Sequence, residues 1–262
     1  MLSLTEAMSA QGATATTKSA ATARPLAYLV QSMYGGAFIG VAVVLMLSAA
    51  GPLRAAGSPW APLVQGVVFG VALTLVVTAG AELATSNMMT LTQGALQGDV
   101  GWGRAGGTLA FSFAGNLAGA AVFAVMVHLT GLRAPGTSAG AMLRAVLEAK
   151  GHETAGQLFW RGVLCNALVC LAIWAGARLR SEVARLLVVF WCLLAFITSG
   201  FEHVVANMTT FSLGLVGGLA ETSWAAFGAN LLVVGLGNLV GGGLVVGAGY
   251  AVAAGRTAPA AS

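Results

Sequence analysis

Long apolar runs constrain this chain more than any other feature, because about 20 consecutive apolar residues are enough for one helix to cross a bilayer. Only 8% of the 262 residues are charged and 58% are hydrophobic, whereas a soluble domain has about 25% charged residues. Because this small number of charges cannot cover a water-facing surface, the chain is predicted to be an all-α integral membrane protein. The expected spans cover 28–50, 62–96, 106–129, 155–177, 186–219 and 224–253.

The second and fifth runs are too long for one crossing, and similar polar residues interrupt both. Stretch 80–88 reads Gly-Ala-Glu-Leu-Ala-Thr-Ser-Asn-Met, and stretch 200–208 reads Gly-Phe-Glu-His-Val-Val-Ala-Asn-Met. A second echo links 115–119 (Gly-Asn-Leu-Ala-Gly) with 237–241 (Gly-Asn-Leu-Val-Gly). Two halves of three spans each must have opposite orientations, and such inverted repeats with broken helices near the midplane are typical of transporters. We therefore expect helices 2 and 5 to be broken within an inverted 3+3 repeat.

The domain prediction is a single six-span transmembrane channel domain over 26–253, with repeat halves at about 26–131 and 155–253. Residues 1–25 are rich in Ala, Ser and Thr, a composition typical of a flexible or surface-lying arm. Residues 254–262 are interpreted as a tail of the same kind, and 130–154 as a loop between the halves. Cationic residues favour the cytoplasmic side of a membrane, and their distribution predicts that both termini are cytoplasmic.

The two interruptions hold the candidate chemistry. Irregular backbone is tolerated at membrane depth only where it is buried in protein or lines a cavity, and the positive amino ends of two half-helices favour an anion. His203 stands where the repeat has Leu83, so architecture alone does not explain it. It is either a structural imidazole bonded in the core or a donor to a passing anion, able to exchange a proton near neutral pH.

The other polar residues of the two interruptions can either hold the broken loops in place or line a pore. Glu82 and Glu202 repeat, and we expect their carboxylates to brace the broken loops by accepting backbone N–H bonds. Asn87 and Asn207 repeat as well, and Asn207 is also within reach of a pore. Thr85 is a hydroxyl donor opposite His203 or a cap for the half-helix that follows it.

Lys150, in the loop before the fourth span, is either solvated or draws anions toward a vestibule.

Other classes of function lack their signatures. The chain has no nucleophile with a base partner, no metal-ligand cluster and no phosphate loop, so we expect no enzyme activity, no metal and no cofactor. Its net charge of +4 is spread over loops without a basic cluster interleaved with aromatics, which argues against nucleic acid as a partner.

The polar stretch at 200–208 resembles the most specific signature of the formate/nitrite transporter family. Stretches 164–174 and 191–196 are most similar to its nitrite-channel branch, and the resemblance covers about 26–250. It implies an aquaporin-like protomer of six spans, assembled as a homopentamer with one pore per protomer. It also implies a location in the bacterial cytoplasmic (inner) membrane.

The resemblance also implies roles for individual residues. His203 would be the central pore histidine, with Thr85 facing it, Asn166 nearby and Asn207 as a pore-facing amide. Lys150 falls at the family's vestibule lysine. The residues that match two apolar constrictions are Phe69, Leu73, Leu83, Val169 and Phe196.

Ala84 departs from the family pattern, which usually has Phe at that position. The change is expected to widen the pore near His203 or to alter gating.

The function predicted from these residues is a pH-dependent channel for nitrite and related small monovalent anions or their neutral acids. Lys150 and the half-helix ends would draw the anion in, and His203 would donate a hydrogen bond or a proton before the apolar constrictions. The alternatives are a formate or hydrosulfide channel, or a proton-coupled nitrite symporter. From another class, a neutral-solute pore or a membrane scaffold would need neither Lys150 nor His203.

Overall fold

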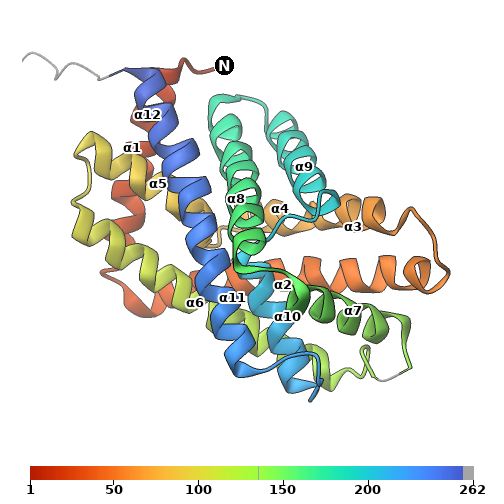
Figure 1. Cartoon of the computed structure of the whole chain (residues 1–262). Helices are drawn as coiled ribbons and strands as arrows, with labels where there is room; N and C mark the ends of the chain where they lie inside the picture. The colour runs from red at the N-terminus through yellow and green to blue at the C-terminus, as the bar shows by residue number, and fades with distance from the viewer. Residues whose placement is uncertain (135, 256–262) are drawn as a thin grey trace, which may run out of the picture.

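The structure of the chain is a computed structural model, which describes residues 1–134 and 136–255, and the regular elements of these residues are all helices. Figure 1 shows their arrangement. The elements are α1 (Leu4–Ala21), α2 (Pro25–Ala55), α3 (Ala61–Phe69), α4 (Val71–Thr78), α5 (Ala84–Gln97), α6 (Trp102–Leu129), α7 (Ser138–His152), α8 (Ala155–Arg178), α9 (Glu182–Thr198), α10 (Val204–Val216), α11 (Trp224–Leu239), the π-helical segment η1 (Val240–Ala248) and α12 (Gly249–Ala254).

Within these described residues, five helical stretches are long and apolar enough to cross a membrane. They are Pro25–Ala55, Ala61–Thr78, Trp102–Leu129, Ala155–Arg178 and Trp224–Ala254. The expected fifth run, 186–219, is divided here between α9 and the shorter apolar helix α10. The expected second run, 62–96, is divided between α3 with α4 and α5.

Glycines with positive φ turn the chain between these half-length helices. Gly80 has φ 76° and Gly200 has φ 72°, a left-handed conformation that glycine adopts without the steric cost of a Cβ. After each glycine the backbone is tied to a neighbouring helix. Glu82 donates its N–H to the carbonyl of Gln31 in α2, and Glu202 donates to the carbonyl of Arg161 in α8.

A buried asparagine side chain holds the first of the two turns. The Asn116 amide of α6 accepts a 2.8 Å bond from the N–H of Ala84 and donates to the carbonyls of Ser32 and Glu82 at 2.6 and 2.8 Å. These backbone groups lie inside the protein, where an unmet polar group costs about 1–3 kcal/mol. Asn116 therefore satisfies the irregular backbone that precedes α5.

Asn238 of α11 makes the equivalent bonds at the second turn. Its amide accepts from the N–H of Val204 at 2.9 Å and donates to the carbonyls of Gly162 and Glu202 at 2.8 and 2.9 Å. The repeated Gly-Asn-Leu-x-Gly stretches of the sequence thus have a physical role that sequence reasoning left open. The amide at the second position of each stretch holds one interruption in place.

The glycines of the same stretches allow their helices to pack closely. A Cβ at Gly119 of α6 would collide with the carbonyl of Met33 in α2, and one at Gly241 would collide with the carbonyl of Val163 in α8. Small residues four apart allow this backbone approach between membrane helices. The asparagines at 116 and 238 can therefore reach the backbone of the turns.

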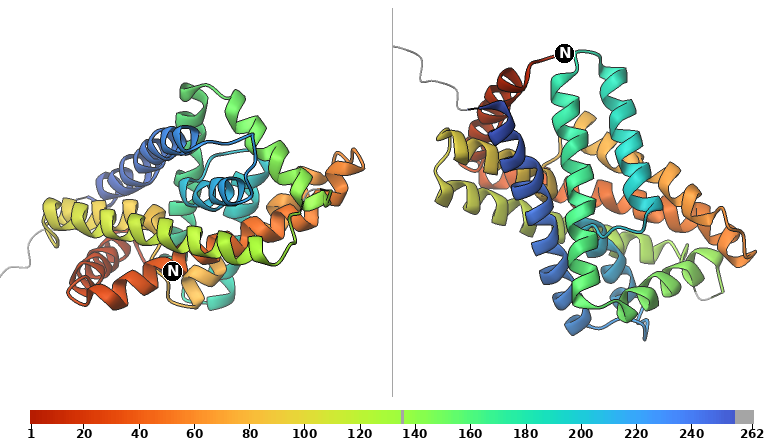
Figure 2. Two further views of the ribbon diagram at one scale, coloured as in Figure 1. Left: turned by 90° about the horizontal axis from the view of Figure 1, so that it is seen from below. Right: turned by 45° about the horizontal axis from the view of Figure 1, so that its top comes forward.

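The first 25 residues differ from the flexible arm expected from their composition. Ser3 and Glu6 form a capping box, and α1 follows with six residues buried, among them Ala7, Met8 and Ala15. The N–H of Leu2 bonds to the carbonyl of Arg178, and Thr5 bonds to the carbonyl of Ala254 at 3.4 Å. The described start and end of the chain therefore lie side by side (Figures 1 and 2). The predicted tail lies outside the described residues from 256 onward.

The segment expected as a loop between the halves contains α7, which Thr137 caps by accepting from the N–H of Gly140. Figure 1 shows α1 and α7 at opposite ends of the molecule. Each of these helices comes directly before the first long helix of its half, α2 or α8. This placement brings a lysine from each to the candidate site.

Candidate functional site

Three cavities follow one another between the α7 end and the α1 end of the molecule. The Lys150 cavity has a volume of about 220 Å³, the central cavity about 10 Å³ and the Lys18 cavity about 420 Å³. Phe69, Phe196 and His203 line both the Lys150 cavity and the central cavity. Leu83 lines the central cavity, and its neighbour Glu82 lines the Lys18 cavity. The interruptions thus lie between two wider chambers.

His203 and Thr85 meet at the centre, each at the start of a half-length helix. Thr85 Oγ1 lies 3.0 Å from His203 Nε2, and both residues are buried. His203 also caps α10, because its Nδ1 accepts the N–H of Ala206 at 3.1 Å. A nitrogen that accepts this bond carries no proton, which assigns the proton of the neutral ring to Nε2. The N–H at Nε2 then donates to Thr85, which leaves the threonine hydroxyl hydrogen for another acceptor.

Asn166 supports this pair from behind. Its amide nitrogen donates to the carbonyls of Thr85 and Asn238 at 3.1 and 2.7 Å, and among the described residues it lines none of the three cavities. Asn166 is therefore near the central residues, as the resemblance implies, with its amide turned to the backbone of Thr85. Its contact links α8 of one half to the start of α5 in the other.

The five residues matched to apolar constrictions all line the central cavity. Each is at most 2% exposed, and the rings of Phe69 and Phe196 meet edge to face with centroids 5.7 Å apart. The ring of Phe196 also stacks near that of His203, at 5.9 Å. The residues are Phe69, Leu73, Leu83, Val169 and Phe196. A cavity needs roughly 10–15 Å³ to hold one water, so the path is shut at this level.

Ala84 follows the cavity-lining Leu83 but lies outside the lining of the central cavity. It is fully buried, it lines none of the three cavities among the described residues, and its N–H bonds to Asn116. The cavity beside His203 is only about 10 Å³. A wider pore or altered gating at Ala84 stays a prediction.

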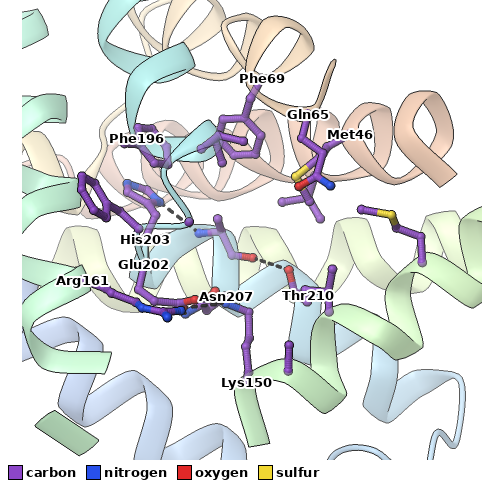
Figure 3. Close-up of a pocket in the computed structure, with 18 of the residues that line it drawn as sticks. Met46, Gln65, Phe69, Lys150, Arg161, Phe196, Glu202, His203, Asn207 and Thr210 are labelled. Carbon is purple, nitrogen blue, oxygen red and sulfur yellow. Dashed lines mark hydrogen bonds and ion pairs between the residues drawn. The ribbon is translucent and has the colours of Figure 1, made fainter. Parts of the chain in front are cut away.

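A lysine, a glutamate and an asparagine form one network in the Lys150 cavity (Figure 3). Lys150 Nζ lies 2.6 Å from both carboxylate oxygens of Glu202, and Asn207 donates to Glu202 at 2.7 Å. Asn207 also donates to Asn230 at 2.8 Å. The donors to Glu202 are side chains, whereas the repeat predicts backbone N–H donors. Lys150 and Asn207 both face the cavity, as the resemblance implies.

A second ion pair lines the same cavity. Arg161 of α8 pairs with Glu153, which directly precedes the cap of that helix. Burial, reinforced by the nearby carboxylate of Glu202, raises the pKa of Glu153 above its ordinary value. Arg161 lies near the start of α8, and its place in the cavity follows from the bend between α7 and α8.

The Lys18 cavity repeats the network of the Lys150 cavity. Lys18 Nζ lies 2.7 Å from Glu82, and Asn87 donates to the same carboxylate oxygen at 3.0 Å. Sequence reasoning missed Lys18, because the segment that carries it resembles a flexible arm. A usable signal was its position shortly before the first span, similar to that of Lys150 before the fourth.

This arrangement places cations at both chambers, hydrogen-bond donors at the centre and an apolar barrier between them. Such a path can attract a small anion toward His203, which lines the central cavity, whereas Thr85 lines none of the three cavities among the described residues. It excludes a hydrated ion from the apolar barrier, because removing the hydration of a charge is costly.

Comparisons with known proteins agree with a transport path. A family model described as "Formate/nitrite transporter" matches residues 5–252. The nitrite transporter NirC of Escherichia coli (strain K12) is 40% identical over 219 residues, which cover 83% of this chain and 80% of the relative. The formate channel FocA of the same organism is 30% identical over 242 residues, covering 85% of this chain and 84% of the relative.

Two solved structures are similar to this fold. An FNT family ion channel matches with a TM-score of 0.89 and 38% identity, over 95% of this chain and 99% of that chain. A pentameric formate channel with formate bound matches with a TM-score of 0.75 and 28% identity, over 89% of this chain and 98% of that chain.

Proposed function

Because the chain belongs to the formate/nitrite transporter family, we propose that it is a channel that conducts nitrite across the bacterial cytoplasmic membrane. The relatives are transporters and channels, and not enzymes. The higher identity to a nitrite transporter than to a formate channel favours nitrite as the main substrate. The observation that carries the proposal is the buried His203–Thr85 pair at the centre, between two cation-bearing cavities.

The proposed protomer has six crossings in an aquaporin-like inverted repeat. The second crossing would combine α3 and α4 with α5, and the fifth would combine α9 with α10. The matching bonds of Asn116 and Asn238 support the repeat, and the contact between Thr5 and Ala254 supports termini on one side, proposed as cytoplasmic. The similarity to a pentameric channel supports a homopentamer.

Local charge would bring anions into the Lys150 cavity. Its lining holds three cationic side chains, of Arg54, Lys150 and Arg161, against the two carboxylates of Glu153 and Glu202. The net positive balance raises the local concentration of a small anion. Lys150 is held by Glu202, so its role is to add to the field of the cavity from a fixed position.

At the centre, His203 and Thr85 would stabilise nitrite through hydrogen bonds. In the resting pair the Nε2 N–H donates to Thr85 Oγ1, so the threonine hydroxyl hydrogen is the donor left for an anion, and the ring N–H becomes a second donor when the pair opens. A second ring proton on Nδ1 would face the N–H of Ala206, so this geometry favours hydrogen bonding by His203 over full proton transfer. A proton that neutralises nitrite would then come from water in the wider cavities, and conduction would increase as pH falls.

Flux measurements on proteoliposomes test this scheme. Stopped-flow and electrical recordings would compare nitrite, formate and hydrosulfide across pH for the wild-type protein and His203→Gln. We expect the variant to lower nitrite flux about tenfold or more, the equivalent of one charge-assisted hydrogen bond. Unchanged nitrite flux and pH dependence in His203→Gln would refute the role of His203.

The same measurements separate the competing functions. Larger formate or hydrosulfide flux would reassign the substrate, and the similarity to a formate channel is the observation that favours formate. Unitary currents under voltage would identify a channel, whereas flux strictly coupled to protons would identify a symporter.

A further inference from the structure

Gln65 is the single polar side chain of α3, and it lines the Lys150 cavity. The other residues of Ala61–Phe69 are Ala, Pro, Leu, Val, Gly and Phe. The Gln65 amide makes no hydrogen bond to any residue that the structure describes. An amide without a partner in an apolar span costs free energy unless it meets water or a ligand. The position of Gln65 therefore points to an occupant of the cavity.

Packing fixes the direction of this side chain. The next residue, Gly66, lies against α9, where a Cβ would collide with Thr198 and with the carbonyl of Leu194. Gln65 and Phe69 are four residues apart, so they share one face of α3. Figure 3 shows both side chains directed into the cavity. The amide is thus held one helical turn from the apolar barrier.

Three other polar side chains that line this cavity already have protein partners. Asn207 uses both of its amide hydrogens on side-chain acceptors, and Thr210 donates its hydroxyl to a backbone carbonyl. Lys150 is paired with the two carboxylate oxygens of Glu202. Gln65, in contrast, keeps two N–H groups for an arriving anion.

The repeat brings the equivalent position to a chamber in the other half as well. Gln65 precedes Glu82 by 17 residues, and Arg185 precedes Glu202 by the same number. Arg185 lines the Lys18 cavity, where its Nε and Nη2 donate to one backbone carbonyl at 2.9 and 2.7 Å. The shared scaffold therefore explains why position 65 faces a chamber. It does not explain a neutral amide there, because the equivalent residue is a cation.

We propose that Gln65 is a substrate-binding residue, which holds nitrite or nitrous acid at the entrance to the apolar barrier. This inference rests on the proposed function of the chain as a nitrite channel. The amide N–H donates to an oxygen of nitrite, and the amide carbonyl accepts the hydroxyl of nitrous acid. Gln65 therefore binds both protonation states of the substrate. Because this contact precedes the barrier, its loss raises the nitrite concentration that half-saturates flux more than it lowers maximal flux.

Concentration-dependent flux into proteoliposomes tests this role. The variants are Gln65→Leu, which removes the amide at similar volume, Gln65→Glu, which adds a carboxylate, and the matched control Gln31→Leu. Gln31 is exposed on α2 and lines none of the three cavities among the described residues. Its carbonyl, which bonds to Glu82, is the same in the variant. Stopped-flow uptake is recorded against nitrite concentration at several pH values, and thermal unfolding is measured for each protein.

We expect Gln65→Leu to raise the half-saturating nitrite concentration about fivefold, the equivalent of one hydrogen bond, and to keep maximal flux within about twofold of the wild type. Its unfolding midpoint should equal or exceed that of the wild type, because the variant removes an unpaired amide. Gln65→Glu should conduct less nitrite at neutral pH, because its carboxylate repels the anion, and should recover as pH falls and the carboxyl group takes up a proton. Gln31→Leu should match the wild type.

An unchanged half-saturating concentration in Gln65→Leu would overturn this role and leave nitrite conduction in place. So would an equal rise in Gln31→Leu, because the effect would then not depend on the cavity. Absence of nitrite flux in the wild type would instead refute the proposed function, and the role of Gln65 with it.

Discussion

The networks around Glu82 and Glu202 contain the same residue types but differ in solvent exposure and in the number of contacts that the lysine makes. Lys18 reaches one oxygen of Glu82, and these side chains are 20% and 14% exposed. Lys150 reaches both oxygens of Glu202, and these side chains are 11% and 7% exposed. The partner asparagines differ as well, because Asn207 has a further bond to Asn230. The half with the tighter network is also the half that carries His203.

The comparison separates what the repeat requires from what the proposed function requires. Equivalent turns need equivalent partners, and Asn116 and Asn238 supply the same three bonds in each half. Position 83 is an apolar wall residue, whereas position 203 is an imidazole that meets Thr85. The scaffold is thus shared, and the chemistry is concentrated on one side of it.

The largest expected effect comes from removing a shared scaffold residue. Asn116→Ala and Asn238→Ala each leave two buried backbone groups of the turn without a partner, one N–H and one carbonyl, at about 1–3 kcal/mol for each group, and each also removes a bond to a helix carbonyl. We expect a loss of about 4 kcal/mol or more in unfolding free energy for both variants, measured by thermal unfolding of the purified protein.

Asn87→Ala is the matched control, because among the described residues that side chain makes a single hydrogen bond, to Glu82. We expect it to lose about 1 kcal/mol. Equal losses in all three variants would show that the turns do not depend on Asn116 and Asn238.

The second prediction tests the difference between the networks directly. Lys150→Met leaves Glu202 buried without a cation, and breaking such a pair costs about 3–5 kcal/mol. Lys18→Met acts on a more exposed pair, for which we expect about 1 kcal/mol. Thermal unfolding at neutral pH measures both losses.

The double variant Lys150→Met/Glu202→Gln should recover most of the stability, because a neutral amide can still accept from Asn207. If Lys18→Met were as destabilising as Lys150→Met, the two networks would be equivalent despite their different burial.

The third prediction concerns the contact that joins the halves. Thr85→Val removes the hydroxyl that meets His203, and we expect nitrite flux to fall about tenfold. Thr85→Ser keeps the hydroxyl and should keep at least half of the flux. Stopped-flow flux into proteoliposomes compares the two, and equal flux in Val and Ser variants would exclude a role for the hydroxyl.

The smallest expected effect is on the pH dependence of nitrite flux, through Glu153 in the Lys150 cavity. The pKa of Glu153 is raised, so the folded protein takes up this proton above the ordinary value of 4.5. As pH falls through the raised pKa of Glu153, its carboxylate loses its charge and releases Arg161. The positive field in the Lys150 cavity then increases. Stability contributed by the protonated form is correspondingly lost as pH rises.

Glu153→Gln should therefore raise nitrite flux at neutral pH about threefold and flatten its increase on mild acidification. Flux measured across pH for wild type and Glu153→Gln tests this. An identical pH profile in both proteins would show that Glu153 does not contribute.

The sequence predicted the parts of the site that stand out against an apolar background. Glu82, Glu202 and His203 are visible because ionisable groups are costly and rare within membrane spans. Helix α1 was missed because its composition is polar and rich in small residues, although Ser3 and Glu6 had the spacing of a capping box. The pairing of Lys18 with Glu82 depends on that helix.

Some contacts cannot be predicted from the local sequence. The amide of Asn116 repeats in the sequence as part of a motif, but its bonds run to α2 and to the turn before α5, far along the chain. Such contacts follow from tertiary packing, which residue patterns do not specify.

The small volume of the central cavity has a consequence for how the anion flux depends on temperature. A space of about 10 Å³ admits no nitrite while the rings of Phe69 and Phe196 stay in place, so each passage requires those rings to move apart. Opening a packed apolar barrier separates surfaces that are in close van der Waals contact, and this carries an enthalpic barrier. Flux should therefore fall more steeply on cooling than diffusion through a water-filled pore, with passage limited by side-chain motion and not by the supply of anions.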